Sequence, residues 1–137
     1  MGQIPDWYGS TGDGWNAILT ILHNELMQVC PEYEAVQVKE KFGGLRAYLE
    51  IPEGVSEAAR NSAYELERKY EAFSQFTCEH CGKTGTNKAN SHGWWSTLCD
   101  PCREVSDDYV AQKRAALKGN VTSARKENTT DSAPGVG

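Results

Sequence analysis

The chain has 137 residues, of which 39% are hydrophobic and 24% charged, an ordinary composition for a globular protein. The formal net charge of −5 argues against a protein that coats nucleic acid through bulk charge, although a local basic patch stays open. No apolar run approaches the roughly 20 residues of a membrane-spanning helix, and the N-terminus lacks a secretory signal, so we expect a cytoplasmic protein with no membrane partner.

The N-terminal part predicts one helix after an irregular lead-in at residues 1–12. The helix is expected to start at Asp13, a good N-cap, and to end at Cys30, because Pro31 follows. We interpret Cys30 as a small core residue. His23 is expected on the side of the helix opposite the apolar stripe.

A β-hairpin follows, with strands at 35–42 and 45–51 on either side of Gly43-Gly44, a strong signal for a two-residue turn. A second helix is then expected after Ser56, which can cap it. Its predicted apolar stripe consists of Ala59, Ala63, Leu66, Tyr70 and Phe73.

The alternation of side chains predicts an apolar face of the hairpin and a basic one. With Gly43-Gly44 as the loop, Lys41 is expected directly opposite Arg46. Glu40 falls on the apolar face, a misfit that indicates either a bulge or an acidic residue placed in a site. The apolar face is predicted to consist of Val36, Val38, Phe42, Leu45, Ala47, Leu49 and Ile51.

The basic face collects Lys39, Lys41, Arg46 and Tyr48. Neighbouring cations repel one another, so their concentration in an acidic protein favours an anion site, in which Arg46 holds a phosphate or carboxylate and Tyr48 offers a ring or hydroxyl. The alternative is a solvated strand face, paired with Glu50 or with an acidic helix.

Four cysteines follow as Cys78-x-x-Cys81, seventeen intervening residues, and Cys99-x-x-Cys102. This spacing is typical of a zinc site with four thiolate ligands, the number that tetrahedral zinc takes. Because all four positions are thiolates, no position stays open for water, and we expect one structural Zn²⁺. Two redox pairs or unlinked thiols are the alternative.

The segment between the cysteine pairs predicts a short hairpin with Trp94 and Trp95, and the residues from Arg103 to Leu117 predict a helix with Pro101 near its first turn. His80 is expected to face solvent and His92 to lie in the turn. The predicted fold class is α+β: a helix–β-hairpin–helix core at 1–76, a treble-clef-like four-cysteine zinc module at 77–118, and a disordered tail at 119–137.

Three stretches carry a family resemblance: Gly14-Trp15, the run from Lys39 to Arg46 (KEKFGGLR), and Trp95-x-Thr97-Leu98-Cys99. In this order, within residues 13–103, they resemble a family of small, largely uncharacterised proteins of bacteriophages and prophages. Family members usually carry an aromatic residue where Ala47 stands. The resemblance implies no activity for any residue. It implies a phage accessory protein in the host cytoplasm that acts on host systems, including antiviral defence.

Two binding hypotheses follow. In the first, the basic face captures an anionic ligand, such as a nucleotide signal of host immunity, in a counter-defence role, and Trp94 or Trp95 stacks on a base. In the second, Trp94 and Trp95 anchor the zinc module to a host protein as an inhibitor or adaptor. Nucleic-acid binding by the zinc finger is less favoured, because its cations alternate with acidic residues. A homo-oligomer stays open.

We expect no enzyme. The sequence has no nucleophile elbow, phosphate-binding glycine loop or H-E-x-x-H motif. Cys30 has no basic residue nearby in the sequence, and Asp107 and Asp108 are adjacent on the predicted helix, so their carboxylates point in different directions.

Overall fold

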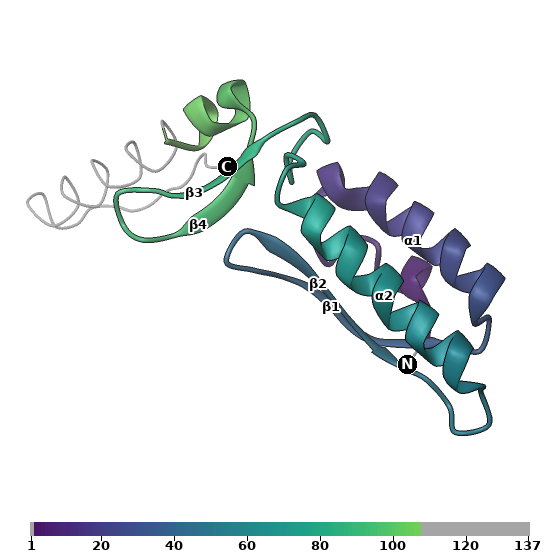
Figure 1. Ribbon diagram of the computed structural model, residues 1–137. Coiled ribbons are helices and arrows are strands. Elements are labelled where there is room, and N and C mark those ends of the chain that lie inside the picture. Colours follow the sequence, from purple (N-terminus) through teal and green to yellow (C-terminus); the bar gives the residue numbers. More distant parts are fainter. Residues whose placement is uncertain (1, 108–137) are drawn as a thin grey trace, which may run out of the picture. The chain divides into compact units, whose positions relative to one another are not determined.

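The computed structural model describes residues 2–107 and has the predicted α+β fold (Figure 1). The predicted tail at 119–137 and the predicted helix beyond residue 107 lie outside the described residues. Residues 2–102 belong to one compact unit, while the predicted boundaries after residues 76 and 118 stay predictions. No helix among residues 2–107 combines the length and apolar character needed to span a bilayer.

The lead-in contains a short 3-10 helix, η1 at Ile4–Trp7, so it is less irregular than predicted, and a second 3-10 helix, η2 at Asp13–Trp15, follows it. Ile4 is fully buried, and the Trp7 indole N–H donates to the carbonyl of Ala35 at 3.1 Å. These two contacts hold the lead-in against the rest of the fold, which explains why a segment with few apolar residues is ordered.

The first α-helix, α1, spans Asn16–Val29 and ends before Pro31 as predicted, but it starts without a side-chain cap. Asp13 instead begins the 3-10 turn η2. The prediction for His23 is wrong: its Nδ1 lies 2.6 Å from the hydroxyl of Tyr33, a core residue that is 1% exposed. His23 therefore borders the core side of α1. Cys30 is buried in the core, as predicted.

The hairpin consists of β1 (Glu34–Lys41) and β2 (Gly44–Glu50), and its turn lies one residue earlier than predicted. Phe42 and Gly43 form the turn with φ angles of 54° and 77°, the sign that a type I′ turn requires at both positions. Consequently Lys39, not Lys41, lies opposite Arg46.

Tertiary contacts explain this register. A Cβ at Gly43 would lie 2.5 Å from the amide nitrogen of Asn87 and 2.8 Å from Cα of Ser96, so only glycine fits there. The Gly43 N–H donates to the carboxylate of Glu40 at 2.7 Å, which explains the acidic residue on the apolar side of the strand. The turn is therefore selected by its neighbours rather than by the glycine pair alone.

A bulge interrupts the alternation of faces at the start of β1. The register shifts between Ala35 and Gln37, so Ala35 rather than Val36 returns to the core. Phe42 was predicted to be in the core, and this is wrong: it is 67% exposed at the turn. Lys39, Lys41, Arg46 and Tyr48 still share one face of β1–β2, as predicted, and we call this the basic hairpin face.

The second helix, α2, spans Glu57–Ser74 and is capped by Ser56, whose hydroxyl accepts from the Ala59 N–H at 3.1 Å, as predicted. It lies beside α1 and along β2 (Figure 1). Within its predicted apolar stripe, Ala63 and Tyr70 are buried, but Phe73 is 50% exposed and does not belong to the core.

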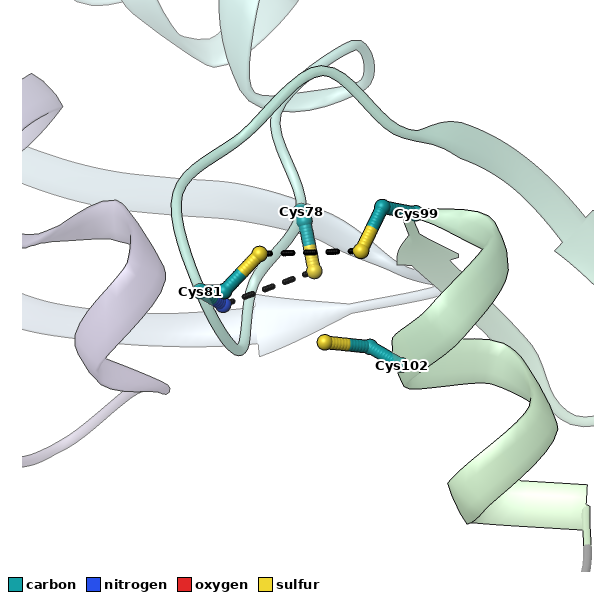
Figure 2. A group of neighbouring side chains, drawn as sticks. All are labelled: Cys78, Cys81, Cys99 and Cys102. Atoms are coloured by element: carbon teal, nitrogen blue, oxygen red, sulfur yellow. Dashed lines mark hydrogen bonds between the residues drawn. The ribbon is translucent and has the colours of Figure 1, made fainter.

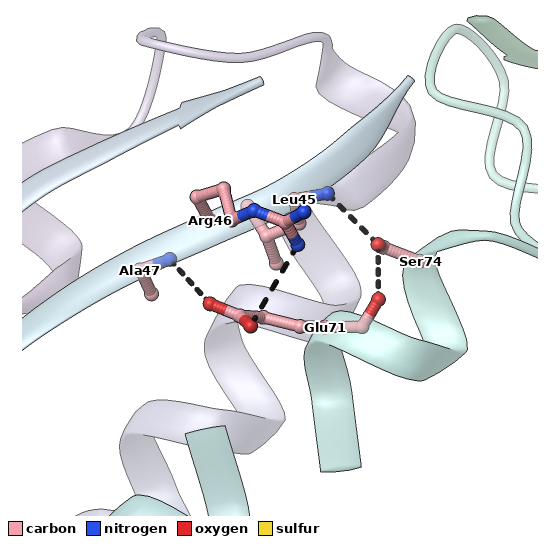
Figure 3. A network of polar contacts seen from close by, with 5 residues as sticks. All are labelled: Leu45, Arg46, Ala47, Glu71 and Ser74. Carbon is pink, nitrogen blue, oxygen red and sulfur yellow. Dashed lines mark hydrogen bonds and ion pairs between the residues drawn. The ribbon is translucent and has the colours of Figure 1, made fainter. Parts of the chain in front are cut away.

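Side chains of α2 cap the outer edge of β2 (Figure 3). The N–H of Leu45 donates to the Ser74 hydroxyl at 2.9 Å, and the N–H of Ala47 donates to the Glu71 carboxylate at 3.1 Å. Ser74 in turn donates to the Glu71 carbonyl at 2.6 Å. Two donors that a third strand would normally satisfy are therefore satisfied by a helix.

The surroundings of Glu67, one turn before Glu71 on α2, disfavour the charged form of its carboxyl group. Burial of its carboxyl, followed by repulsion from Glu71, raises the pKa of Glu67 from 4.5 to about 7. Because the folded pKa is raised, the folded state keeps a proton between these values that the unfolded state loses. The contribution of Glu67 to stability is therefore largest below pH 4.5 and is lost as the pH rises through 7.

We expect Glu67→Gln to stabilise the protein by about 1 kcal/mol at pH 8, a value reduced for the partial exposure of the carboxyl, and to have no effect at pH 4. Urea unfolding at both pH values measures this. Glu65→Gln, on an exposed position of the same helix, is the control with no expected change. Equal effects of both substitutions at pH 8 would contradict the assignment.

A single apolar core joins η1, α1, the hairpin and α2, and Trp15, Tyr33 and Tyr70 contribute its aromatic rings. Its buried members are Ile4, Trp15, Ile18, Leu19, Leu22, Leu26, Cys30, Tyr33, Ala35, Val38, Leu45, Ala47, Ile51, Ala63 and Tyr70.

The cysteine-rich segment forms the second hairpin, with β3 at Thr86–Ala89 and β4 at Trp95–Leu98. Residues 100–107 are helical, and Pro101 lies in the first turn, as predicted. A cysteine knuckle, a hairpin and a helix that starts at the second cysteine pair follow one another in the order of a treble clef.

Candidate metal centre and basic hairpin face

The first cysteine pair lies on a tight backbone knuckle. The Cys81 N–H donates to the Sγ of Cys78 at 3.4 Å (Figure 2). The Gly82 N–H donates to the Cys78 carbonyl at 2.9 Å. Gly82 has φ +86°, a left-handed conformation that glycine adopts without strain. The second pair lies where β4 passes into the helix, so that the two pairs face each other.

The four thiols are positioned to hold one metal ion. The sulfur atoms of Cys78, Cys81, Cys99 and Cys102 all lie within 4.8 Å of one another, and those of Cys81 and Cys99 are 3.6 Å apart. Tetrahedral coordination with bonds of about 2.3 Å places sulfur atoms about 3.8 Å apart. All five cysteines of the chain are free thiols, so the two predicted pairs are not disulfides.

The surroundings separate the pKa values of these thiols. Burial opposes ionisation of Cys78, but the backbone N–H groups of Cys99, Cys81 and His80 outweigh it and lower the pKa of Cys78 to about 6. The hydrogen bond with Cys99, followed by burial, raises the pKa of Cys102 to about 12. One thiolate is thus present at neutral pH, whereas the raised pKa values of Cys81 and Cys102 mean that these two thiols lose their protons only as a metal ion binds.

Two hydrogen bonds connect the knuckle to η2, directly before α1. The Gly14 N–H donates to the Glu79 carbonyl at 2.9 Å, and the indole N–H of Trp15 donates to the Thr77 carbonyl at 2.9 Å. A Cβ at Gly14 would lie only 2.1 Å from the Cys78 carbonyl oxygen. The geometry of the cysteine cluster therefore depends on a glycine about 65 residues earlier in the chain, through close backbone packing.

Thr97 connects the knuckle to the turn of the first hairpin. Its N–H donates to the Glu79 carboxylate, and its carbonyl accepts from the Glu79 N–H, both at 2.9 Å. Its hydroxyl donates to the Gly43 carbonyl at 2.6 Å and accepts from the side-chain amide of Asn87 at 3.0 Å. The same amide donates to the Phe42 carbonyl at 3.2 Å. Thr97 itself is fully buried.

We expect Thr97→Val to cost about 2 kcal/mol, since it preserves shape but leaves the buried Gly43 carbonyl without its donor. Thr97→Ser keeps the hydroxyl and loses one methyl group, so it should cost about 1 kcal/mol. Urea unfolding compares the two variants. If Thr97→Val were as stable as the wild type, the hydroxyl would not connect the two hairpins in the manner described.

The basic hairpin face keeps its predicted members but not their predicted pairing. Arg46 is directly opposite Lys39, and its guanidinium lies 3.9 Å from the Glu71 carboxylate (Figure 3). An acidic helix thus supplies one counter-charge, as the solvated-face alternative anticipated. Within residues 2–107, neither Lys39 nor Lys41 forms an ion pair. Their ammonium groups lie 6.0 Å from the Tyr48 ring and 5.8 Å from the Phe42 ring, respectively.

Trp94 and Trp95 are separate from this face. They are 74% and 45% exposed, and within the described chain no hydrogen bond or ring contact joins them to the basic hairpin face. Trp95 does lie on the same side of β3–β4 as Thr97, two residues earlier in β4, and the Thr97 hydroxyl donates to the Gly43 carbonyl in the hairpin turn. Trp95 is therefore better placed than Trp94 to contact a ligand near that turn.

His80 and His92, the two histidines of the predicted zinc module, lie where they were predicted. His80 is exposed, and its Nδ1 lies 3.6 Å from the Cys102 sulfur. The His92 N–H donates to the side chain of Asn90 in the loop of β3–β4. The cysteine cluster consists of the four predicted thiols, with neither histidine included.

Sequence reasoning missed three residues of the site: Gly14, Phe42 and Thr97. Each lies in a stretch that carries the family resemblance, which was the available signal. No family model matches the chain, and no significantly similar curated protein or solved structure was found.

Proposed function

We propose that this protein is a non-enzymatic binding protein, stabilised by one structural Zn²⁺, that captures an anionic, nucleotide-type ligand on the basic hairpin face. The observation that carries this proposal is the placement of Lys39, Lys41 and Arg46 on one face, where Arg46 alone forms an ion pair within residues 2–107. Uncompensated cations on one surface of an acidic protein attract an anion, and an arginine can hold a phosphate with two hydrogen bonds.

Zinc fits the donor set of the cysteine cluster. Four thiolates complete a tetrahedral shell and leave no position for water or substrate, so the ion would stabilise the fold without taking part in catalysis. The resemblance to phage proteins supports a counter-defence role, in which the protein removes a nucleotide signal of host immunity by binding it stoichiometrically.

Calorimetry with a nucleotide panel tests the proposal. We expect the double variant Lys39→Gln/Lys41→Gln to weaken binding by at least tenfold, because it removes two of the three cations of the basic hairpin face. The variant should fold normally, since neither lysine has an ion-pair partner in the described fold. Lys69→Gln is the matched control, since Lys69 also lies near an aromatic ring, that of Tyr70, but on α2. Absence of binding, or equal losses in both variants, would refute an anion site here.

The exposure of Trp94 and Trp95 favours a second candidate, an inhibitor or adaptor that binds a host protein. A pull-down from host lysate with the wild type and with Trp94→Ala/Trp95→Ala distinguishes it. This candidate requires a partner that the double variant fails to capture and that nucleotides do not displace.

A further inference from the structure

Core packing does not explain the backbone conformation and the exposure of Phe42. It is the one non-glycine residue with positive φ in the described chain, at 54°, and its side chain is 67% exposed. A bulky residue rarely adopts this conformation, and such strain persists only where the surroundings impose it. Hydrogen bonds from Asn87 to the Phe42 carbonyl and from Thr97 to the Gly43 carbonyl impose it here, through the backbone alone.

A second ring lies further along the same hairpin. Tyr48 is 38% exposed and close to the ammonium group of Lys39, as Phe42 is close to that of Lys41. The Lys39–Arg46 pair lies between the two rings. Along the hairpin, this face therefore presents an aromatic ring at the turn, then three cations, and then a second aromatic ring.

The spacing of the rings indicates the size of the ligand. Tyr48 lies four residues along β2 from Gly44, where the turn ends, which corresponds to about 13 Å at the usual rise of a strand. Stacked nucleotides rise about 3.4 Å each, so roughly four nucleotides cover this length. A mononucleotide reaches one ring only.

We infer that the basic hairpin face binds single-stranded nucleic acid, with the phosphates on Lys39, Lys41 and Arg46 and with unpaired bases stacked on Phe42 and Tyr48. This inference rests on the proposed function and names its ligand class. Aromatic rings interleaved with cations are the means by which proteins bind single strands without reading their sequence, and duplexes do not offer their base faces. The acidic remainder of the protein confines the contact to this face.

The test is fluorescence anisotropy with labelled oligothymidylate and oligouridylate of about eight nucleotides, compared with ATP and with a duplex as competitors. We expect at least one oligonucleotide to bind tenfold or more tightly than ATP, and the duplex to compete weakly. Three cations predict that log K falls with log salt concentration with a slope of about −2. The two oligonucleotides distinguish DNA from RNA as the source of the single strand.

Variants test the stacking. Phe42→Gly removes the ring and relieves the backbone strain, so it should fold normally and lose about 5- to 100-fold in affinity, as should Tyr48→Ala. Phe42→Trp and Tyr48→Phe keep a ring and should bind like the wild type. Phe76→Ala is the matched control, because Phe76 is 68% exposed but follows α2.

Binding of ATP as tight as that of the oligonucleotides, or oligonucleotide binding that survives Phe42→Gly and Tyr48→Ala, would overturn the inference and leave the anion site of the proposed function intact. If neither ATP nor any oligonucleotide binds, both proposals fail.

Discussion

Removal of the metal is expected to unfold residues 77–102 and to leave α1 and α2 helical. The second hairpin has only four residues in each strand, and a two-stranded sheet of this size is marginal without further support. A structural zinc centre contributes on the order of 10 kcal/mol in isolated zinc-finger peptides, so its loss should exceed what the remaining contacts of this segment supply. Hydrogen exchange before and after chelation, resolved by segment, measures the effect.

Cys99→Ser should reproduce the result of chelation, with less than one metal ion per chain by elemental analysis. Cys30→Ala is the control, because Cys30 is a free thiol in the apolar core, away from the cluster. This variant should keep one ion per chain and lose only about 1 kcal/mol of stability. If residues 77–102 kept their protection from exchange in excess chelator, the cysteine cluster would not be a structural metal centre.

Gly14→Ala is expected to cost about 3 kcal/mol and to weaken metal binding. The new methyl group would lie 2.1 Å from the Cys78 carbonyl oxygen and 2.7 Å from the Gly82 nitrogen. Both are backbone atoms of the knuckle that holds the first two thiols, so relief of the clash must displace those thiols or separate the knuckle from α1. Urea unfolding and competition with a chromogenic chelator measure the two effects.

Gly54→Ala is the matched control for this prediction. Nothing lies within 4 Å of a Cβ at Gly54, and its φ is not in the left-handed region, so the change in stability should stay within about 0.5 kcal/mol. Equal behaviour of the two alanine variants would show that Gly14 is not packed against the knuckle as the structure has it.

The elements that could be predicted from the sequence are those whose signals are local. Ser56 caps α2, Pro31 ends α1, and the cysteine spacing predicted a cluster that the structure assembles from two distant pairs. The composition of the basic hairpin face could also be predicted, since alternation along a strand is a local property. The identity of the ion and the activity were not accessible in this way and stay proposals.

The register of the hairpin could not be predicted, because it is decided by residues far along the chain. Gly43-Gly44 is the better turn by local preference, yet Asn87, Ser96 and Thr97 select Phe42-Gly43. The error placed Phe42 in the core, when it is the most exposed aromatic ring of the first hairpin. The role in binding that we propose for Phe42 rests on its φ angle, its exposure and its carbonyl partner, none of which follows from the local sequence.

The three stretches of the family resemblance meet in space. Gly14 and Trp15 contact the knuckle, and Thr97 joins that knuckle to the turn at Gly43. The residues of these stretches therefore describe how the cysteine cluster is attached to a helical core and to a hairpin tip. This is a structural reason for them to occur together in one sequence.

The capping of β2 by Glu71 and Ser74 has a consequence for biosynthesis. The ribosome releases both strands of the first hairpin before the helix that completes their hydrogen bonds, and two strands alone rarely persist in water. Until about 25 further residues have been synthesised, the nascent hairpin therefore has an open strand edge that can pair with another chain. A chain truncated before residue 71 should aggregate, whereas one extended through Ser74 should remain monodisperse during synthesis.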